Sequence, residues 1–117
     1  MARREIRAVN ETLSVVLPVH NAEATLAGQV RDLLETLADS RSRFEIVIVD
    51  DGSTDDTPEC AGDLARQFPQ LRVLRNRRRQ GKYSAIRQGL RLTNGRIVIV
   101  HDDSAPIHGI PRQLARS

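Results

Sequence analysis

An acidic cluster after an apolar run is the clearest candidate for chemistry in this 117-residue sequence. Residues 50–56 hold four carboxylates, more than a turn requires. Asp50 or Asp51 could accept the N–H of a pyrimidine or bind a ribose hydroxyl, and Gly52 would let the backbone approach a ligand closely. Ser53 completes the Asp-Asp-Gly-Ser segment. The alternative is a plain strand-to-helix turn, since Asp, Gly and Ser are common turn residues.

A second acidic pair, Asp102 and Asp103, follows the apolar run 97–100. Adjacent carboxylates suit a hard divalent cation, Mg²⁺ or Mn²⁺, which prefers oxygen ligands and bridges to substrate phosphates. Such an ion would neutralise charge on a departing diphosphate. The alternative is an exposed acidic turn.

Lys82 follows Gly81 at the expected start of a helix, where its ammonium and the helix dipole would both favour a phosphate. No P-loop pattern is present, and a solvated surface lysine is the alternative. The basic cluster 75–79 fits a solvated loop better than a phosphate site. Cys60 has no evident base partner and is expected to be a small, largely buried apolar side chain.

These residues need a scaffold, and the apolar pattern predicts one. Short β-branched runs at 13–17, 44–49, 71–74 and 97–100 are typical of buried strands, and amphipathic stripes between them predict three helices. Asn21 is expected to cap the first helix, Thr57 and Pro58 to begin the second, and Asn94–Gly95 to end the third in a left-handed conformation. Residues 105–117 are expected to be a tail, with one short helix from Pro111.

Alternating strands and helices of this kind predict an α/β fold with a mostly parallel sheet of about four strands and helices on both faces. Right-handed crossovers would place the carboxyl ends of the strands at one edge. The polar segments 18–23, 50–56 and 101–104 would then share one crevice, the usual ligand position in such sheets. This shared crevice is the central prediction from the sequence.

The composition excludes several classes of protein. Hydrophobic residues make up 39% and charged residues 28%, which excludes collagen-like and wholly disordered chains. Eighteen basic and fifteen acidic residues give a net charge of +3, but aromatic residues are only 3%, which argues against dedicated nucleic-acid binding. No run is long enough to cross a bilayer, no secretory signal opens the chain, and one cysteine fits a cytoplasmic setting.

Four segments together resemble the nucleotide-binding half of family 2 glycosyltransferases, which have the GT-A fold. They are LSVVLPVHNAE (13–23), FEIVIVDDGSTD (44–55), GKYSAI (81–86) and GRIVIVHDD (95–103). The resemblance implies a nucleoside-diphosphate sugar donor, linked to UDP or GDP, and transfer to an acceptor hydroxyl with inversion. It also implies a function in cell-envelope biosynthesis and a location at the inner face of a membrane.

The resemblance also assigns roles to individual residues. Pro18, Val19 and His20 would line the nucleobase pocket, with His20 where the family usually has tyrosine. Glu23 would be the acidic residue after Asn21. Further along the chain, Asp51 would contact the base, Lys82 would approach the diphosphate, and Asp102 would begin the D-x-D metal motif.

Two features depart from the family pattern. An ungapped count from Gly95 puts the second acid of D-x-D on Ser104, whereas a shift of one residue would use Asp103. The acceptor-binding half, which supplies the general base in the family, does not follow residue 104. We therefore expect a lead-in at 1–12, a truncated donor-binding domain at 13–104, and a tail at 105–117. The alternatives are a non-catalytic nucleotide-binding or regulatory module and, less well supported, a receiver-like phosphoacceptor domain. A homo-oligomer is left open.

Overall fold

The computed structural model describes residues 12–40, 42–95, 97–102 and 105–111. For residues 96–117 the description is limited to the backbone of two strands. The elements in chain order are β1 (Thr12–Val19), α2 (Leu26–Ala38), β2 (Arg43–Asp51), α3 (Thr57–Gln67), β3 (Leu71–Asn76), α4 (Lys82–Leu92), β4 (Ile97–Asp102) and β5 (Ala105–Pro111). The predicted alternation of strands and helices is confirmed.

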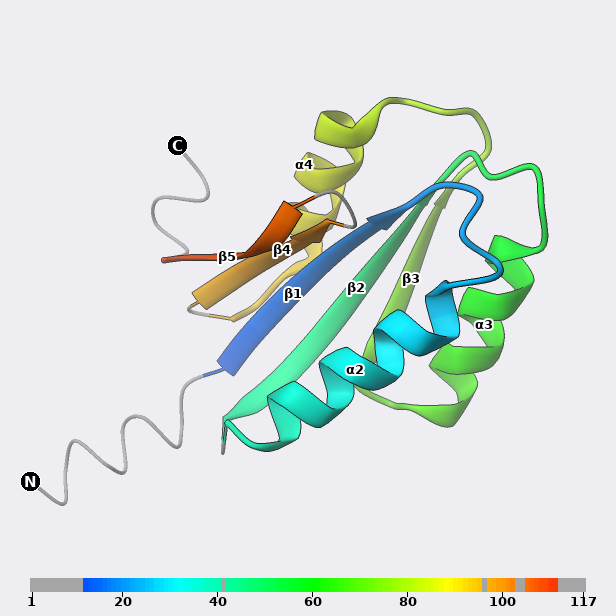
Figure 1. Ribbon diagram of the computed structural model, residues 1–117. Helices are drawn as coiled ribbons and strands as arrows, with labels where there is room; N and C mark the ends of the chain where they lie inside the picture. The colour runs from blue at the N-terminus through cyan, green and yellow to red at the C-terminus, as the bar shows by residue number, and fades with distance from the viewer. Residues whose placement is uncertain (1–11, 41, 96, 103–104, 112–117) are drawn as a thin grey trace, which may run out of the picture.

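The strands form one sheet in the order β3-β2-β1-β4-β5 (Figure 1). β1 pairs in parallel with β2 and β4, and β2 pairs in parallel with β3. The chain builds outward from β1 to β3 and then crosses to the other side of β1, so the gap between β1 and β4 is the topological switch point. The predicted α/β class with a mostly parallel sheet is confirmed.

The sheet has a fifth strand that the sequence pattern did not predict. β5 pairs antiparallel with β4, from Ile97 opposite Pro111 to Asp102 opposite Ala105. The segment expected to be a tail therefore begins with an edge strand. Proline is compatible with an edge, where its missing N–H removes no hydrogen bond from an inner ladder. The short helix expected after Pro111 lies outside the described residues.

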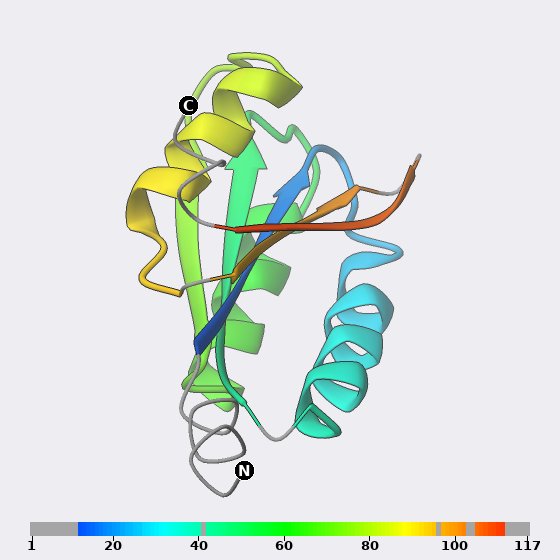
Figure 2. The ribbon, with the colours of Figure 1, turned by 90° about the vertical axis from the view of Figure 1, so that its left-hand side faces the viewer.

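Helices cover both faces of the sheet, as predicted. Figure 2 shows α4 on one side and α2 and α3 on the other. Alternation along β1 sends Val15, Leu17 and Val19 toward α2 and α3, and Val16 toward α4. The same alternation divides β2, with Ile46 and Ile48 on the first face and Val47 and Val49 on the second. Strands buried on both faces explain the uninterrupted apolar runs.

Two of the predicted helix ends are wrong. The residue before α2 is Thr25, whereas Asn21 lies four positions earlier in a left-handed conformation at φ 51°. The third helix ends at Thr93 in an extended conformation, and among the described residues only Gly52 and Gly81 are glycines with positive φ. Gly95 is needed for space instead, because a Cβ there would lie 2.4 Å from the Ser14 hydroxyl.

The start of α3 agrees with the sequence to within one residue. Thr57 is the first helical residue, Asp56 precedes it, and Pro58 lies in the first turn, where a missing N–H costs nothing. The Asp55 side chain accepts hydrogen bonds from both the backbone N–H and the hydroxyl of Thr57. The turn is thus closed by Asp55.

Candidate functional site

The loops that follow β1 and β2 are tied together by hydrogen bonds. The backbone N–H of Asn21 donates to the Ser53 hydroxyl at 2.8 Å, and the Asn21 side-chain oxygen accepts from the Thr54 N–H at 2.8 Å. The Ala22 N–H donates to the Thr57 hydroxyl, also at 2.8 Å. Two of the predicted clusters therefore meet at one edge of the sheet. Asn21 and Ser53, both candidate ligand residues, join these two loops.

The Asp51 carboxylate holds a third loop, residues 77–81, against the same edge. It is buried, with 3% of the residue exposed. Its Oδ1 accepts from the backbone N–H of Gln80 at 2.8 Å and from the Asn76 amide at 3.1 Å, and its Oδ2 accepts from the Gly81 N–H at 3.0 Å. Three donors stabilise the charged form of a buried carboxylate. Asp51 thus fixes the segment that leads into α4.

Gly52 lets this loop approach closely. Its φ is 69°, and a Cβ there would lie 2.4 Å from the backbone nitrogen of Arg79 and 2.7 Å from the carbonyl carbon of Arg78. A side chain at this position would be strained and would also push the loop away. The sequence predicted that Gly52 lets the backbone approach a ligand, which stays a prediction; in the structure the backbone of Arg78 and Arg79 approaches Gly52.

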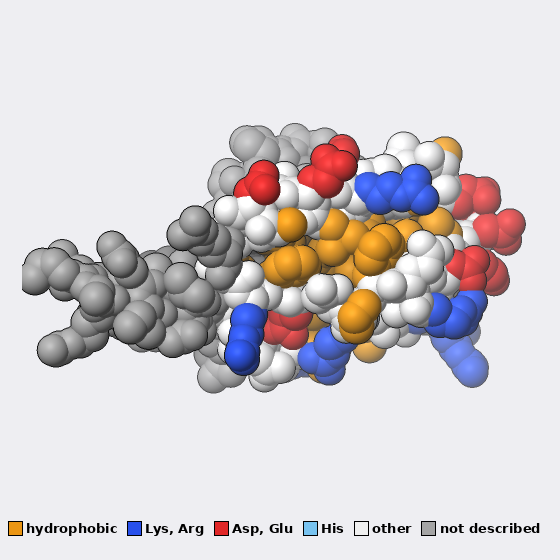
Figure 3. All heavy atoms as spheres, turned by 90° about the horizontal axis from the view of Figure 1, so that it is seen from below, with side chains coloured by type: hydrophobic (Ala, Val, Ile, Leu, Met, Phe, Trp, Pro, Cys, Tyr) orange, Lys and Arg blue, Asp and Glu red, His pale blue; other side chains and the backbone are white. Residues whose placement is uncertain are grey.

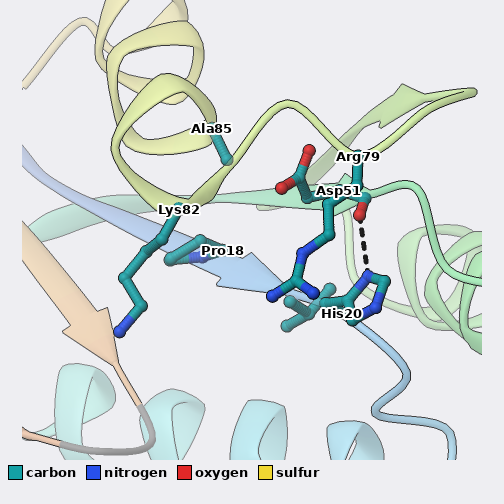
Figure 4. Close-up of a pocket in the computed structure, with 7 residues that line it drawn as sticks. Pro18, His20, Asp51, Arg79, Lys82 and Ala85 are labelled. Atoms are coloured by element: carbon teal, nitrogen blue, oxygen red, sulfur yellow. Dashed lines mark hydrogen bonds between the residues drawn. The ribbon is translucent and has the colours of Figure 1, made fainter.

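A pocket of about 140 Å³ opens between the end of β1 and the start of α4 (Figure 4). Seven residues line it: Pro18, Val19, His20, Asp51, Arg79, Lys82 and Ala85. In Figure 4 the Arg79 side chain is directed toward His20, and Lys82 extends to the other side of Pro18. The pocket therefore combines apolar lining atoms with two cations. It is smaller than the roughly 300–1,000 Å³ of most ligand clefts, so it suits one ring of a larger molecule.

The hydrogen bonds of His20 fix its tautomer. Its Nδ1 lies 2.8 Å from the Asp51 carbonyl oxygen, which can only accept, so Nδ1 carries the proton. The neutral ring then has Nε2 as an acceptor, 3.4 Å from the Asn21 amide nitrogen. His20 lines the pocket as the sequence predicted, and the bond to Asp51 links the β1 and β2 loops across it.

Arg79 lines the pocket, although the sequence favoured a solvated loop for residues 75–79. The available signal was its position between a strand and a helix that begins with Gly81 and Lys82, which places it at the same sheet edge as the acidic clusters. Ala85 is buried on α4 and is also part of the pocket wall. Lys82 lies at the pocket, and its approach to a diphosphate stays a prediction.

Asp50 lies outside this pocket. Because side chains alternate along β2, its carboxylate faces the α3 side of the sheet, where Oδ1 accepts from the Ser53 N–H at 3.3 Å and from the Ser53 hydroxyl. Asp50 is fully buried, and within the described structure its Oδ2 has no hydrogen-bond partner. The Arg75 Nε lies 3.9 Å from that oxygen. These contacts give Asp50 a part in the Ser53 turn.

Glu23 lies at a different hollow, between α2 and α3, and is not a lining residue of the pocket above. This groove is lined by Glu23, Ala27, Arg31, Asp56, Glu59, Cys60, Asp63, Leu64 and Gln67. Figure 3 shows an apolar strip exposed along this face of the molecule. Burial and the nearby Asp63 and Glu23 raise the pKa of the Cys60 thiol, which favours its protonated form at neutral pH.

The carboxyl end of β4 lies at the same edge as the pocket. Val100 is opposite Val16 in the parallel ladder, so Asp102 lies near the carboxyl end of β1. The backbone thus brings Asp102, the first residue of the predicted metal motif, to this edge of the sheet. The side chain of Asp102, and Asp103 and Ser104 altogether, lie outside the description. Among the residues described, no group of three His, Cys, Asp or Glu side chains is arranged to hold a metal ion.

Curated relatives match most of the chain. It is 34% identical over 107 residues to the β-monoglucosyldiacylglycerol synthase of Nostoc sp., covering 90% of this chain and 23% of the relative. It is 34% identical over 96 residues to the dolichyl-phosphate β-glucosyltransferase of Saccharomyces cerevisiae, covering 77% and 29%. The chain therefore spans about a quarter of the length of these relatives. No helix in the described segments is long and apolar enough to span a bilayer.

Solved structures share the fold. A mannosyltransferase of Pyrobaculum calidifontis, in complex with GDP-Man and Mn²⁺, superposes with a TM-score of 0.69 at 28% identity, covering 80% of this chain and 27% of that one. The glucosyl-3-phosphoglycerate synthase of Mycobacterium tuberculosis, in complex with Mn²⁺, UDP and glucosyl-3-phosphoglycerate, gives 0.63 at 34% identity, covering 84% and 35%. Residues 14–105 match the sequence profile of Glycosyl transferase family 2. The chain belongs to this glycosyltransferase family and has its GT-A fold.

Proposed function

We propose that this chain is the donor-binding part of a glycosyltransferase that uses a nucleoside-diphosphate sugar. The observation that carries the proposal is the pocket between the end of β1 and the start of α4, where Pro18, Val19 and Ala85 lie beside Arg79 and Lys82. Apolar walls suit the flat face of a nucleobase, and the cations suit a diphosphate. The relatives solved with GDP-Man or UDP support the same ligand class.

The contacts of the loops suggest which residues would bind the nucleobase and which would bind the diphosphate. Pro18, Val19 and His20 would form the wall against the base, with the His20 Nε2 presented as an acceptor. Arg79 and Lys82 would meet the diphosphate. The Asp51 carboxylate would position both cations through Gln80 and Gly81 while retaining acceptor capacity toward the base.

Asp102 and Asp103 are the residues proposed to hold a divalent cation, Mg²⁺ or Mn²⁺. The donor set fits such an ion, because carboxylate oxygens are its preferred ligands and the end of β4 lies at the pocket edge. Two related structures are complexes with Mn²⁺ and either GDP-Man or UDP. When bound, the ion would neutralise charge on the departing diphosphate.

In the complete reaction an acceptor hydroxyl oxygen would form a bond to the anomeric carbon while the bond to the diphosphate breaks. The electron pair leaves with the nucleoside diphosphate, and the configuration is inverted. The hydroxyl proton passes to a general base, a role that we assign to no described residue. The relatives include a β-monoglucosyldiacylglycerol synthase and a dolichyl-phosphate β-glucosyltransferase, so a lipid acceptor at a membrane is the proposed acceptor class.

The test is calorimetric titration of the chain with UDP and GDP, with and without Mn²⁺. We expect binding of one of them, strengthened by Mn²⁺ in the native chain and not in Asp102→Asn or Asp103→Asn. Binding that is indifferent to Mn²⁺ would instead favour a nucleotide-binding module without transferase chemistry.

A substitution at the pocket separates phosphate recognition from folding. Lys82→Gln should weaken diphosphate binding about tenfold with little change in stability, because Lys82 is solvent-exposed. Arg91→Gln, at the other end of α4, is the matched control and should bind like the native chain. Equal affinity of the Lys82 variant and the control would contradict the proposed site.

A further inference from the structure

Charge is divided unevenly between two segments of the chain. Between Leu71 and Gly95 the chain has eight basic side chains and no acidic one. Between Glu23 and Gln67 it has eleven acidic and four basic ones. The first segment supplies β3, the loop to α4, and α4 itself, whereas the second supplies α2, α3 and β2. The net charge of +3 therefore combines a basic segment, Leu71–Gly95, with an acidic segment, Glu23–Gln67.

In the basic segment, Arg72 lies 3.8 Å from Glu45 and Arg75 lies 3.9 Å from Asp50, but four other arginines have no acidic neighbour among the described residues. Arg77, Arg78, Arg87 and Arg91 are all solvent-exposed, and none forms an ion pair with another described residue. On α4, Ala85 and Gly89 are buried against the sheet, so Arg87 and Arg91 project from the opposite side of the helix. Their positive potential is therefore directed outward, away from the sheet.

Tyr83 adds an aromatic ring to this surface. It is 78% exposed, which makes it the most exposed large hydrophobic side chain described. It lies one turn before Arg87 on α4, so the two side chains are neighbours on the same face of the helix. An exposed tyrosine among arginines is typical of side chains that occupy the interface between a bilayer and water.

We propose that this surface, made by Arg77, Arg78, Tyr83, Arg87 and Arg91, docks on an anionic lipid bilayer. Arginines near such a surface gain from its negative potential, and a tyrosine ring is stable at the level of the headgroups. Nucleic acid is the competing polyanion. Binding single strands uses several aromatic rings as stacking platforms, and this surface has one.

The position of the surface gives the docking a purpose. Arg77 and Arg78 belong to the loop that also carries Arg79 into the pocket, so the docked surface borders the pocket mouth. A bilayer at α4 would bring a lipid acceptor close to the bound donor. This purpose rests on the proposed function, but the docking itself does not.

The experiment measures partition of the full chain onto sedimented vesicles. One set is phosphatidylcholine alone, and the other is an equimolar mixture with phosphatidylglycerol. The test variant is Arg87→Gln with Arg91→Gln. The control is Arg31→Gln with Arg66→Gln, which removes the same charge from exposed positions on α2 and α3. Circular dichroism checks that each variant is folded.

We expect the native chain and the control to bind the anionic vesicles and not phosphatidylcholine, with binding that weakens as salt rises. The test variant should partition about twenty-fold more weakly, because each arginine near an anionic surface contributes roughly fivefold. Tyr83→Ser should also weaken binding and should leave its dependence on salt unchanged.

Two results would overturn the proposal. Equal weakening of the test variant and the control would show an effect of net charge alone. Tighter binding of a polyuridine oligonucleotide than of the anionic vesicles, at the same salt, would show that the partner is nucleic acid. Titration with UDP and GDP in the absence of vesicles is a separate readout: if it fails while vesicle binding persists, the proposed function fails and the docking surface remains.

Discussion

The two faces of the sheet have different roles: one contributes mainly to stability, and the other contributes to ligand recognition. Among the side chains that the structure describes, the face toward α2 and α3 buries thirteen hydrophobic residues in one cluster, whereas the face toward α4 buries four. The pocket, the basic loop and the exposed arginines are all on the thinner side or at its edge. Because burial of apolar area is the main source of stability, the α2/α3 face should carry most of it. Side chains on the α4 side are then available to contact a ligand.

The largest effect should come from the thick core. Leu26 is fully buried at the start of α2, so Leu26→Ala should lower the free energy of unfolding by about 2–5 kcal/mol through lost burial and a cavity. Leu90→Ala in α4, where the leucine is half-buried, should cost clearly less. Urea denaturation of both variants measures the difference. Equal losses would contradict the unequal division of the core.

A substitution at Asp51 tests whether stability and ligand binding are coupled. Asp51→Asn replaces an acceptor by a donor facing the N–H groups of Gln80 or Gly81, and should cost about 1.5–3 kcal/mol of stability and weaken diphosphate binding. Asp63→Asn, an exposed charge on α3, should stay within about 0.5 kcal/mol of the native chain. An Asp51 variant that keeps full affinity would show that the loop is positioned by other contacts.

Two helical glycines should respond to alanine substitution with opposite changes in stability. A Cβ at Gly89 of α4 would lie 2.5 Å from Val16 Cγ1 and 3.1 Å from Val49 Cγ2, so Gly89→Ala should destabilise the protein by about 1–2 kcal/mol despite better helix propensity. Gly28 of α2 has open space, so Gly28→Ala should stabilise by about 0.4–1 kcal/mol. Thermal unfolding of the pair checks both signs. A stabilising Gly89→Ala would mean that α4 is free to move outward.

The smallest effect concerns pH. The hydrogen bond from the Thr57 hydroxyl lowers the pKa of Asp55 below its ordinary value, although desolvation opposes this. Its contribution to stability is therefore present above the unfolded-state pKa and is lost as pH falls through the folded-state value. Asp55→Asn should flatten the loss of melting temperature in acid. Glu35→Gln, an exposed residue of α2, is the control for removing one negative charge and should leave the acid slope as in the native chain.

Much of the fold was readable from the sequence because its signals are local. The four apolar runs became the four parallel strands, and the stripes between them became α2, α3 and α4. Pro18, Val19 and His20 were placed at one edge of the sheet with Asp51 by a topological rule, since parallel strands end at a common edge, and all four line the pocket. Each of these inferences needed only spacing, burial pattern and chain order.

What was missed depends on contacts between distant segments. Asn21 looked like a helix cap, yet it binds Thr54 across the β1 and β2 loops. Arg79 looked like one of several surface arginines. The hydrogen bonds from the Gln80 and Gly81 N–H groups to the Asp51 carboxylate hold its loop at the pocket. β5 has no apolar run of its own, and pairing with β4 makes it a strand.

By itself the sequence determined the order of strands and helices, the family, and the residue types gathered at the carboxyl edge, because periodicity and motif spacing are properties of the chain. The tertiary structure decided which carboxylate faces the pocket, since a step of one residue along β2 turns Asp50 to one face and Asp51 to the other. It also decided that Arg87 and Arg91 lie on the side of α4 that faces away from the sheet, because Ala85 and Gly89 are buried against it. Both outcomes follow from packing across the sheet, which no single segment of the sequence encodes.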